Sequence, residues 1–288
     1  MNTLHQDAGM FREALALTRE QTGFAERLIE KDYFCTLLLG HVAGKATGLV
    51  FKGGTCLAKI HANFYRLSED MDFVIPMPAD APRSQRRKGV AALKEIVPEL
   101  PVRLPCFRLV EPLTGAYHST HYTAAVGYES LTTGREEAIK IEVGLREPLL
   151  LPVCEGRART LLLDPVSRAA RLEPLAVRCM AKREAFAEKF RAALSRREVA
   201  ARDFFDLDYA VRELGLHPDD EELIGLVRQK LAVQGNAPVD VSETRLAQLH
   251  QQLDSELRPV LRQEDFEAFD VERAFRIVAG MAVKVKRV

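Results

Sequence analysis

The chain has 288 residues and no net charge, because 41 lysines and arginines balance 41 aspartates and glutamates. This length suggests one large domain or two modest ones, and a neutral protein is not a general binder of nucleic acid. No apolar run approaches the roughly 18 residues that span a bilayer, and the first residues lack the basic start and apolar core of a signal peptide, so we expect a cytoplasmic protein with no membrane partner.

Helical and strand patterns alternate in the first part of the chain. Helical periodicity covers residues 10–43 and 83–97. Apolar or alternating segments predict strands, at 49–52, 70–76, 106–111, 121–130 and 137–146. This mixture predicts an α+β class, with a small mixed or antiparallel sheet flanked by helices.

Three prolines, Pro148, Pro152 and Pro165, then interrupt the chain and suggest a domain border. Almost everything beyond them has helical periodicity, at 173–183, 185–200, 203–214, 219–233, 243–257 and 265–284. We therefore expect two domains, residues 1–165 with the sheet and residues 166–288 with helices.

The segment around Gly53 and Gly54 has the pattern of a strand, a sharp turn and a helix. Residues 49–51 are apolar and suit a buried strand, and the glycines lack the Cβ atom that would hinder a tight turn or a close ligand. Thr55 opens the helix, where free N–H groups and a hydroxyl favour phosphate oxygens. Taken alone, a Gly-Gly pair is usually only a turn.

Asp70 and Asp72 follow on the next predicted strand. Side chains two apart on a strand point to one face, so the two carboxylates lie together while Met71 and Phe73 point to the other face. A hard cation such as Mg²⁺ relieves their repulsion, and Mg²⁺ binds proteins through one or two carboxylates plus substrate phosphates. A lone Asp-x-Asp is usually a solvated edge, but here it follows the glycine turn closely. The combination predicts a site for a nucleoside triphosphate and a divalent metal.

Basic residues are enriched between Arg171 and Arg202. This segment has nine of them, at Arg171, Arg178, Lys182, Arg183, Lys189, Arg191, Arg196, Arg197 and Arg202, and only four acids. Lys182, Lys189 and Arg196 recur every seven residues, which predicts one face of a helix or of a closely packed helical pair. A local basic face on a neutral protein indicates an anionic partner, although an ordinary charged helix exterior has the same pattern.

The five cysteines are odd in number and widely spaced, and no Cys-x-x-Cys occurs. Free thiols in a reducing compartment are the expected state. His61, His118 and His121 show no spacing typical of metal ligands.

Two blocks of this chain resemble the AbiEii/AbiGii family of nucleotidyltransferase toxins, within the DNA polymerase β-like superfamily. The first reads Phe-Lys-Gly-Gly-Thr-x-Leu-x-Lys from Phe51, followed by Arg-x-Ser-Glu-Asp-x-Asp-Phe from Arg66, with Glu-Lys-Asp-Tyr upstream from Glu30. The second runs from Glu188 through Lys189 to the Arg-Asp-Phe-Phe-Asp-Leu segment that starts at Arg202. The resemblance covers roughly residues 25–210.

The resemblance implies roles for particular residues. Asp70 and Asp72 would hold Mg²⁺ or Mn²⁺, and Lys189 would offset charge on the triphosphate. Asp203 and Asp206 match a further motif and would orient Lys189 or an acceptor hydroxyl, or alternatively cap the helix near Phe204. Ile-Lys-Ile-Glu from Ile139 resembles the family's second motif, so Glu142 is a candidate third carboxylate; the wet face of a strand has the same alternation.

Two further groups of residues complete the predicted site. Nucleotide binding is assigned to Lys52, Gly53, Gly54, Thr55, Lys59 and Lys140. RNA binding is assigned to Arg196, Arg197 and Arg202.

The function that the resemblance implies is transfer of a nucleotide from a nucleoside triphosphate to RNA, with tRNA as the expected acceptor. The chain would then be a metal-dependent enzyme and the toxin of a toxin–antitoxin system, with a cognate antitoxin as partner. Two alternatives stand beside this: the same chemistry on a small molecule such as an antibiotic or on a protein hydroxyl, and a non-catalytic binding module on the same fold. Loss of Asp70 or Asp72 would have favoured the last alternative, and both are present.

Overall fold

The computed structural model describes residues 4–46, 48–78, 80–146 and 148–286. The chain forms two compact units, Met1–Met180 (unit 1) and Ala181–Val288 (unit 2). All the described strands lie in unit 1, and the described elements of unit 2 are helical. Among the described helices, none combines the length and the apolar character that crossing a membrane requires.

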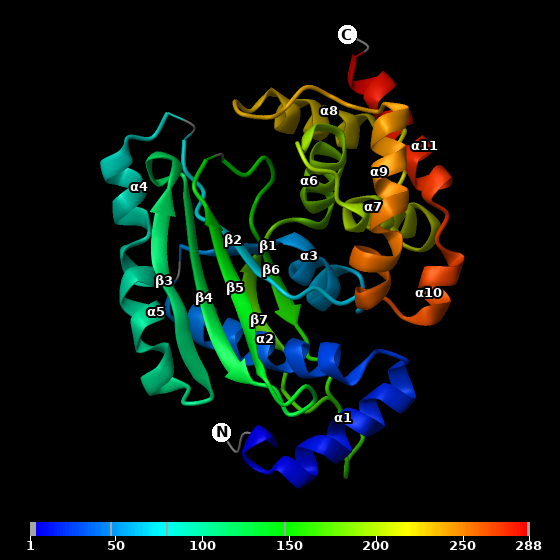
Figure 1. The fold of residues 1–288 in the computed structure, drawn as a ribbon. Helices are drawn as coiled ribbons and strands as arrows, with labels where there is room; N and C mark the ends of the chain where they lie inside the picture. The colour runs from blue at the N-terminus through cyan, green and yellow to red at the C-terminus, as the bar shows by residue number, and fades with distance from the viewer. Residues whose placement is uncertain (1–3, 47, 79, 147, 287–288) are drawn as a thin grey trace. The chain divides into compact units, whose positions relative to one another are not determined.

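Unit 1 is built on a seven-stranded mixed sheet with the strand order β3-β4-β5-β2-β1-β7-β6 (Figure 1). The strands are β1 (Val50–Lys52), β2 (Met71–Val74), β3 (Phe107–Ala116), β4 (His121–Glu129), β5 (Glu136–Gly144), β6 (Cys154–Ala158) and β7 (Leu175–Cys179). β2 pairs with β5, and β1 with β7, in parallel; the other neighbours are antiparallel. The expected α+β class with a mixed sheet is confirmed, with two more strands than the sequence predicted.

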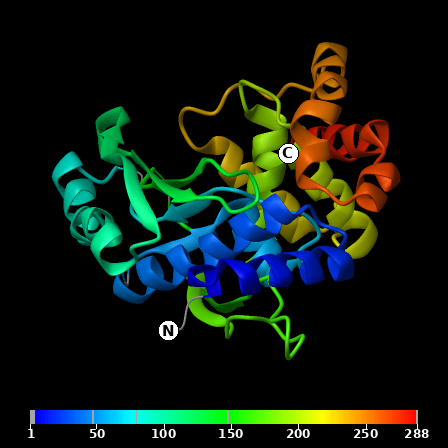
Figure 2. The same cartoon turned by 60° about the horizontal axis from the view of Figure 1, so that its bottom comes forward.

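The apolar face of this sheet is covered by helices. Unit 1 has the helices α1 (Ala8–Thr22), α2 (Glu26–Lys45), α3 (Gly53–Cys56), α4 (Arg83–Gly89) and α5 (Ala91–Arg103) and the short helical turns η1 (Leu4–Gln6), η2 (Leu57–His61) and η3 (Tyr117–Ser119). Figure 2 shows α1 and α2 running along one side of the sheet. Phe34 of α2 stacks on Tyr128 of β4 with ring centroids 4.1 Å apart, and both side chains belong to the buried core. Alternating strand residues thus face the helices, and the residues between them face away.

The structure corrects the expectation of a helix over residues 173–183, because Leu175–Cys179 form strand β7. Phe51 of β1 pairs with Cys179 of β7, and β7 in turn pairs along its length with β6, a strand that the sequence pattern did not reveal. A five-residue strand is too short for periodicity to separate it from helix, so pairing with β1 decides its conformation. The boundary between the compact units falls after Met180 rather than after residue 165.

Unit 2 contains α6 (Lys182–Ser195), α7 (Ala201–Glu213), α8 (Glu221–Ala232), α9 (Glu243–Gln252), α10 (Gln263–Ala268) and α11 (Val271–Lys286), with η4 (Leu253–Leu257) and η5 (Arg258–Val260) between α9 and α10. Buried ion pairs join these helices. Lys230 of α8 binds Glu184 of α6 at 2.7 Å, with both side chains almost completely buried. Asp208 of α7 binds Arg273 of α11 at 2.6 Å. The expected helical character of this part of the chain is observed.

Candidate active site

The polar face of the sheet brings together residues from three neighbouring strands. Asp72 of β2 lies directly opposite Lys52 of β1 and Glu142 of β5. Directly paired residues point to the same face of a sheet, so these three side chains share the face away from α2. Asp70 comes immediately before β2, and Met71 lies between the two aspartates, buried on the apolar side. The alternation predicted from the sequence is therefore observed for Met71 and Asp72.

Gly53 is required by the position of Asp72. Its φ of 76° is in the left-handed region, and a Cβ atom added there would lie 2.1 Å from Asp72 Oδ2. Only glycine combines that backbone conformation with room for the neighbouring carboxylate. The turn thus sets the aspartate against the start of α3.

Gly54 lies beside a buried cation that the sequence analysis did not single out. A Cβ atom at Gly54 would approach Arg66 Nη2 to 2.7 Å and Ser68 Oγ to 3.0 Å, and Arg66 is only 2% exposed. These two side chains therefore leave no space for a Cβ atom at Gly54, even without a bound triphosphate. The signal for Arg66 was present in the sequence, since it opens the Arg-x-Ser-Glu-Asp-x-Asp block.

Two residues assigned to nucleotide binding have structural partners instead. The Thr55 hydroxyl donates to the backbone carbonyl of Asp70 at 2.5 Å, which fixes the start of α3 to the start of β2. Lys59 is completely buried, and its Nζ donates to Asp32 Oδ1 and to Thr36 Oγ1, both at 2.6 Å. These partners give Lys59 a structural role in the core, and its assignment to nucleotide binding stays a prediction.

The Glu-Lys-Asp segment of α2 also holds the surroundings of the site. Glu30 is buried and accepts hydrogen bonds from the Ser130 hydroxyl and the Leu131 N–H in the turn between β4 and β5, both at 2.6 Å. Lys31 contacts Glu69, the residue before Asp70, at 3.3 Å. Asp32 receives Lys59.

Glu69 itself is held as a carboxylate. Burial would raise its pKa, but Lys31 and Arg27 offset this and lower the pKa below the ordinary value. A second anion is thus fixed next to Asp70 by partners on α2.

Lysine charge balances the carboxylates on the polar face. Lys140 and Glu142 form an ion pair on β5, and the pKa of Lys140 is raised mainly by its hydrogen bond to Glu142 and further by Asp70 and Asp72. His121 Nε2 lies 3.8 Å from Glu142, and burial lowers the pKa of this histidine, with Lys140 and Lys52 adding to the effect. His121 therefore adds a polar group to the face, although its spacing predicted no site role.

The donor set of Asp70 and Asp72 fits a hard divalent cation. Mg²⁺ and Mn²⁺ prefer carboxylate oxygens, and the field of both aspartates reaches Lys140 on the same face. Glu142 is paired with Lys140 and lies in register with Asp72. Its role as a third metal ligand stays a prediction.

Lys189, Asp203 and Asp206 form a separate cluster within unit 2. Lys189 Nζ on α6 binds Asp203 Oδ1 at 2.7 Å and Asp206 Oδ2 at 2.8 Å, both on α7. Asp203 and Asp206 are buried, and Lys189 is mostly so. Helix α7 begins at Ala201 with Ala200 as its N-cap, so neither aspartate caps it. Both aspartates contact the lysine, and their expected part in orienting Lys189 for the reaction stays a prediction.

The basic segment is not one helical face. Arg171 and Arg178 belong to unit 1, and within unit 2 several of the other cations have acidic partners, such as Arg183 with Asp220 and Arg191 with Glu188. Arg196 and Arg197 are exposed in the loop after α6 rather than on the helix, and Arg196 contacts Asp203 at 3.3 Å. Arg202 is partly buried on α7. The nine basic residues, which outnumber four acidic ones in this segment, are thus divided between the two units and partly neutralised.

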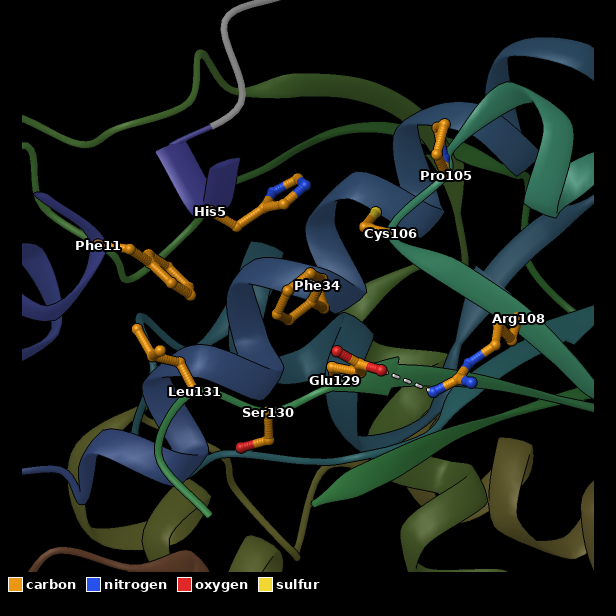
Figure 3. Close-up of a pocket in the computed structure, with 9 residues that line it drawn as sticks. All are labelled: His5, Phe11, Phe34, Pro105, Cys106, Arg108, Glu129, Ser130 and Leu131. Atoms are coloured by element: carbon orange, nitrogen blue, oxygen red, sulfur yellow. Dashed lines mark hydrogen bonds and ion pairs between the residues drawn. The ribbon is translucent and has the colours of Figure 1, made fainter. Parts of the chain in front are cut away.

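A cavity of about 540 Å³ lies elsewhere in unit 1 (Figure 3). None of the aspartates and lysines of the polar face lines it. His5, Phe11, Phe34 and Leu131 line it, with the Arg108–Glu129 ion pair at one side. Phe34 belongs to α2, so this cavity is on the helix-covered side of the sheet and the carboxylates are on the other.

Comparison with known proteins now decides the family. The model of the AbiEii nucleotidyl transferase toxin family, a type IV toxin–antitoxin system, matches residues 37–276. The chain belongs to this family. The resemblance seen in the sequence is confirmed, and the family supports nucleotidyl transfer, a nucleoside triphosphate substrate and a cognate antitoxin.

Solved structures with the same fold share little sequence with this chain. A putative nucleotidyltransferase from H. pylori aligns with a TM-score of 0.53 and 15% identity over 92% of this chain and 97% of its own. JHP933 from Helicobacter pylori gives a TM-score of 0.50 and 16% identity, over 92% and 94%. MenT4, a nucleotidyltransferase toxin from Mycobacterium tuberculosis H37Rv, gives 0.49 and 19%, over 94% and 98%. No curated protein matches the sequence.

We predict that Gly53→Ala displaces Asp72 and lowers nucleotide transfer by about 10²-fold, because the added methyl group overlaps the carboxylate. Gly134→Ala is the matched control, since Gly134 also has a positive φ of 64° but its Cβ would meet nothing within 4 Å. Transfer of labelled nucleotide and thermal unfolding would be measured for both. Equal losses of activity in the two variants would show that backbone strain alone is responsible.

We predict that Lys59→Ala lowers the free energy of unfolding by about 3–5 kcal/mol, because it leaves the carboxylate of Asp32 buried without its cation. Lys88→Ala, at an exposed position of α4, should change it by less than about 0.5 kcal/mol. Urea unfolding followed by circular dichroism measures both. If Lys59→Ala were as stable as Lys88→Ala, the ion pair would not be a structural requirement.

Proposed function

We propose that this chain transfers a nucleotide from a nucleoside triphosphate to a hydroxyl group of RNA, with tRNA as the acceptor, and that Mg²⁺ or Mn²⁺ bound by Asp70 and Asp72 takes part. The observation that carries the reaction is the alignment of Asp72 with Lys52 and Glu142 beside the Gly53 turn. The alignment of carboxylates and lysines on one face of the sheet, in a member of a nucleotidyltransferase family, supports this assignment.

Each residue on this face has a part in the proposal. The bound ion would supply Lewis-acid stabilisation of the phosphate oxygens. Lys52 and the backbone at Gly53 and Gly54 would bind the triphosphate, since cations and unpaired N–H groups attract phosphate. Lys140 would exchange its ion pair with Glu142 for a phosphate oxygen. Arg66, buried beside Gly54, would keep the surroundings of the turn positive.

Lys189 is proposed to neutralise charge that develops on the triphosphate. Its support is the family motif and the pair of buried aspartates, which hold the ammonium in one orientation before substrate binds. Asp203 and Asp206 would then be positioning residues that act through Lys189.

The RNA acceptor rests on exposed cations in unit 2. Arg196 and Arg197 lie in a loop, where their side chains can reach a phosphate backbone. Arg202 would assist from α7. Acceptance of a small molecule or a protein hydroxyl is the outcome that would replace this part of the proposal.

We predict that Asp72→Asn abolishes transfer, with a loss of about 10²-fold or more, because the amide removes the charge that holds the cation while keeping the shape of the side chain. Glu129→Gln, at an exposed carboxylate of β4, is the control and should retain activity. Release of pyrophosphate and incorporation of α-labelled nucleotide would be followed over a Mg²⁺ and Mn²⁺ titration. Activity of Asp72→Asn close to that of the parent would refute the metal assignment.

We predict that Arg197→Glu raises the KM for tRNA several-fold and leaves the KM for the nucleotide unchanged, because it replaces a phosphate contact by a repulsive charge. Arg197 is preferred to Arg196, whose contact with Asp203 would also disturb Lys189. Arg12→Glu on α1 makes the same charge change at an exposed position and serves as the control. An unchanged KM for tRNA, or better transfer to an RNA-free extract, would remove RNA as the acceptor.

A further inference from the structure

Three side chains with affinity for soft metals converge on the other side of the β1–α3 turn. One ligand atom from each of Cys56, His61 and Cys179 lies within 4.8 Å of the other two. Cys56 ends α3, His61 ends η2, and Cys179 ends β7. His61 and Cys179 are separated by 117 residues, so sequence spacing gave no sign of the cluster.

The sulfur atoms of Cys56 and Cys179 lie in the core of unit 1, with a glycine packed against one of them. Cys56 and Cys179 are completely buried, and His61 is partly exposed. Gly156 of β6 lies alongside, where a Cβ atom would approach Cys179 Sγ to 2.8 Å. Cys179 pairs with Phe51, so it faces the apolar side of the sheet, opposite to Asp72. The cluster is therefore distinct from the carboxylate site.

A hydrogen bond to the backbone fixes the tautomer of the His61 ring. Its Nε2 lies 2.9 Å from the carbonyl oxygen of Met180, and a carbonyl can only accept. Nε2 therefore carries the proton and Nδ1 carries the free lone pair. Metal-binding histidines are usually oriented by such a hydrogen bond from the other ring nitrogen to a carbonyl.

We propose that Cys56, His61 and Cys179 bind a zinc-type divalent cation. Two thiolates and a neutral imidazole are the ligands that Zn²⁺ prefers, whereas Mg²⁺ prefers carboxylates. Two thiolates also neutralise the charge of the ion, which lowers the free-energy cost of burying it. Cys154 lies directly opposite Cys179 in the β6–β7 register, but its exposed thiol contacts the Pro152 carbonyl at 3.8 Å and is outside the three-ligand cluster.

A bound ion would connect Cys56, the residue after Thr55, to Cys179 of β7, and would thereby stabilise the glycine turn.

The test uses the full chain, kept in a non-thiol reductant with excess Mg²⁺ to occupy carboxylates. After addition of Zn²⁺ and dialysis, we expect about one zinc per chain by mass spectrometry of the metal. Substitution by Co²⁺ should give the near-ultraviolet band of thiolate–cobalt charge transfer, which carboxylate ligands do not produce. Zn²⁺ should also raise the unfolding temperature.

Substitutions distinguish metal binding at this cluster from binding at the carboxylate site or at another cysteine. Cys179→Ser, and His61→Gln at the more exposed position, should lose the cobalt band and the zinc-induced thermal shift. Cys106→Ser, a half-buried cysteine outside the cluster, should keep both. Asp72→Asn should also keep both, so that failure of the proposed transferase site and failure of this site are distinguishable. Circular dichroism without metal checks that each variant folds.

Three results would overturn the proposal. One is the absence of a thiolate–cobalt band in the parent protein. Another is equal zinc content in the parent and in folded His61→Gln. The third is a Cys56–Cys179 disulfide in the protein prepared without oxidant, found by peptide mass mapping, which would make the pair a redox couple rather than a metal site.

Discussion

The buried ion pair between Asp32 and Lys59 is the constraint on which the rest of unit 1 depends. It joins α2 to the helical segment after the Gly53 turn, and Asp32 also accepts the Leu161 N–H at 2.9 Å. Two charges removed from water are tolerated only when they are well paired and hydrogen-bonded, so the three segments must come together in one arrangement. The adjacent Glu30 and Lys31 act in the same way on the β4–β5 turn and on Glu69. A single turn of α2 thus holds the segment after the Gly53 turn, the β4–β5 turn and Glu69, the residue before Asp70.

On this frame, the polar face of the sheet concentrates charge of both signs. Asp72 is opposite Lys52 and Glu142, and Lys140 neutralises Glu142. Carboxylates so close together would repel one another, and nearby lysines reduce that repulsion. The absence of a Cβ atom at Gly53 lets the carboxylate of Asp72 approach the turn. The geometry and the electrostatics of this face therefore both suit the binding of a hard cation.

The two faces near the β1–α3 turn carry opposite kinds of ligand. Carboxylates on the open face suit a hard cation, and the thiols and imidazole on the buried face suit a softer one. Because Cys56 directly follows Thr55, an ion on the buried face would stabilise the Gly53 turn, which also borders the proposed substrate site. The alternation of side chains along β1 and its neighbours makes this division possible.

The sequence by itself determined the local unit of strand, glycine turn, helix and Asp-x-Asp, because these features depend on backbone geometry within a few residues. It also determined the family, through Lys189 and the other motif residues, and the helical character of unit 2. Only the tertiary structure decided that residues 175–179 form a strand, because pairing with β1 overrides a weak local preference. It likewise decided that Lys59 is a core residue, and that Cys56, His61 and Cys179 meet. Side-chain charge and polarity are visible in a sequence, but the partners that determine what a charged group does are brought together only by long-range packing.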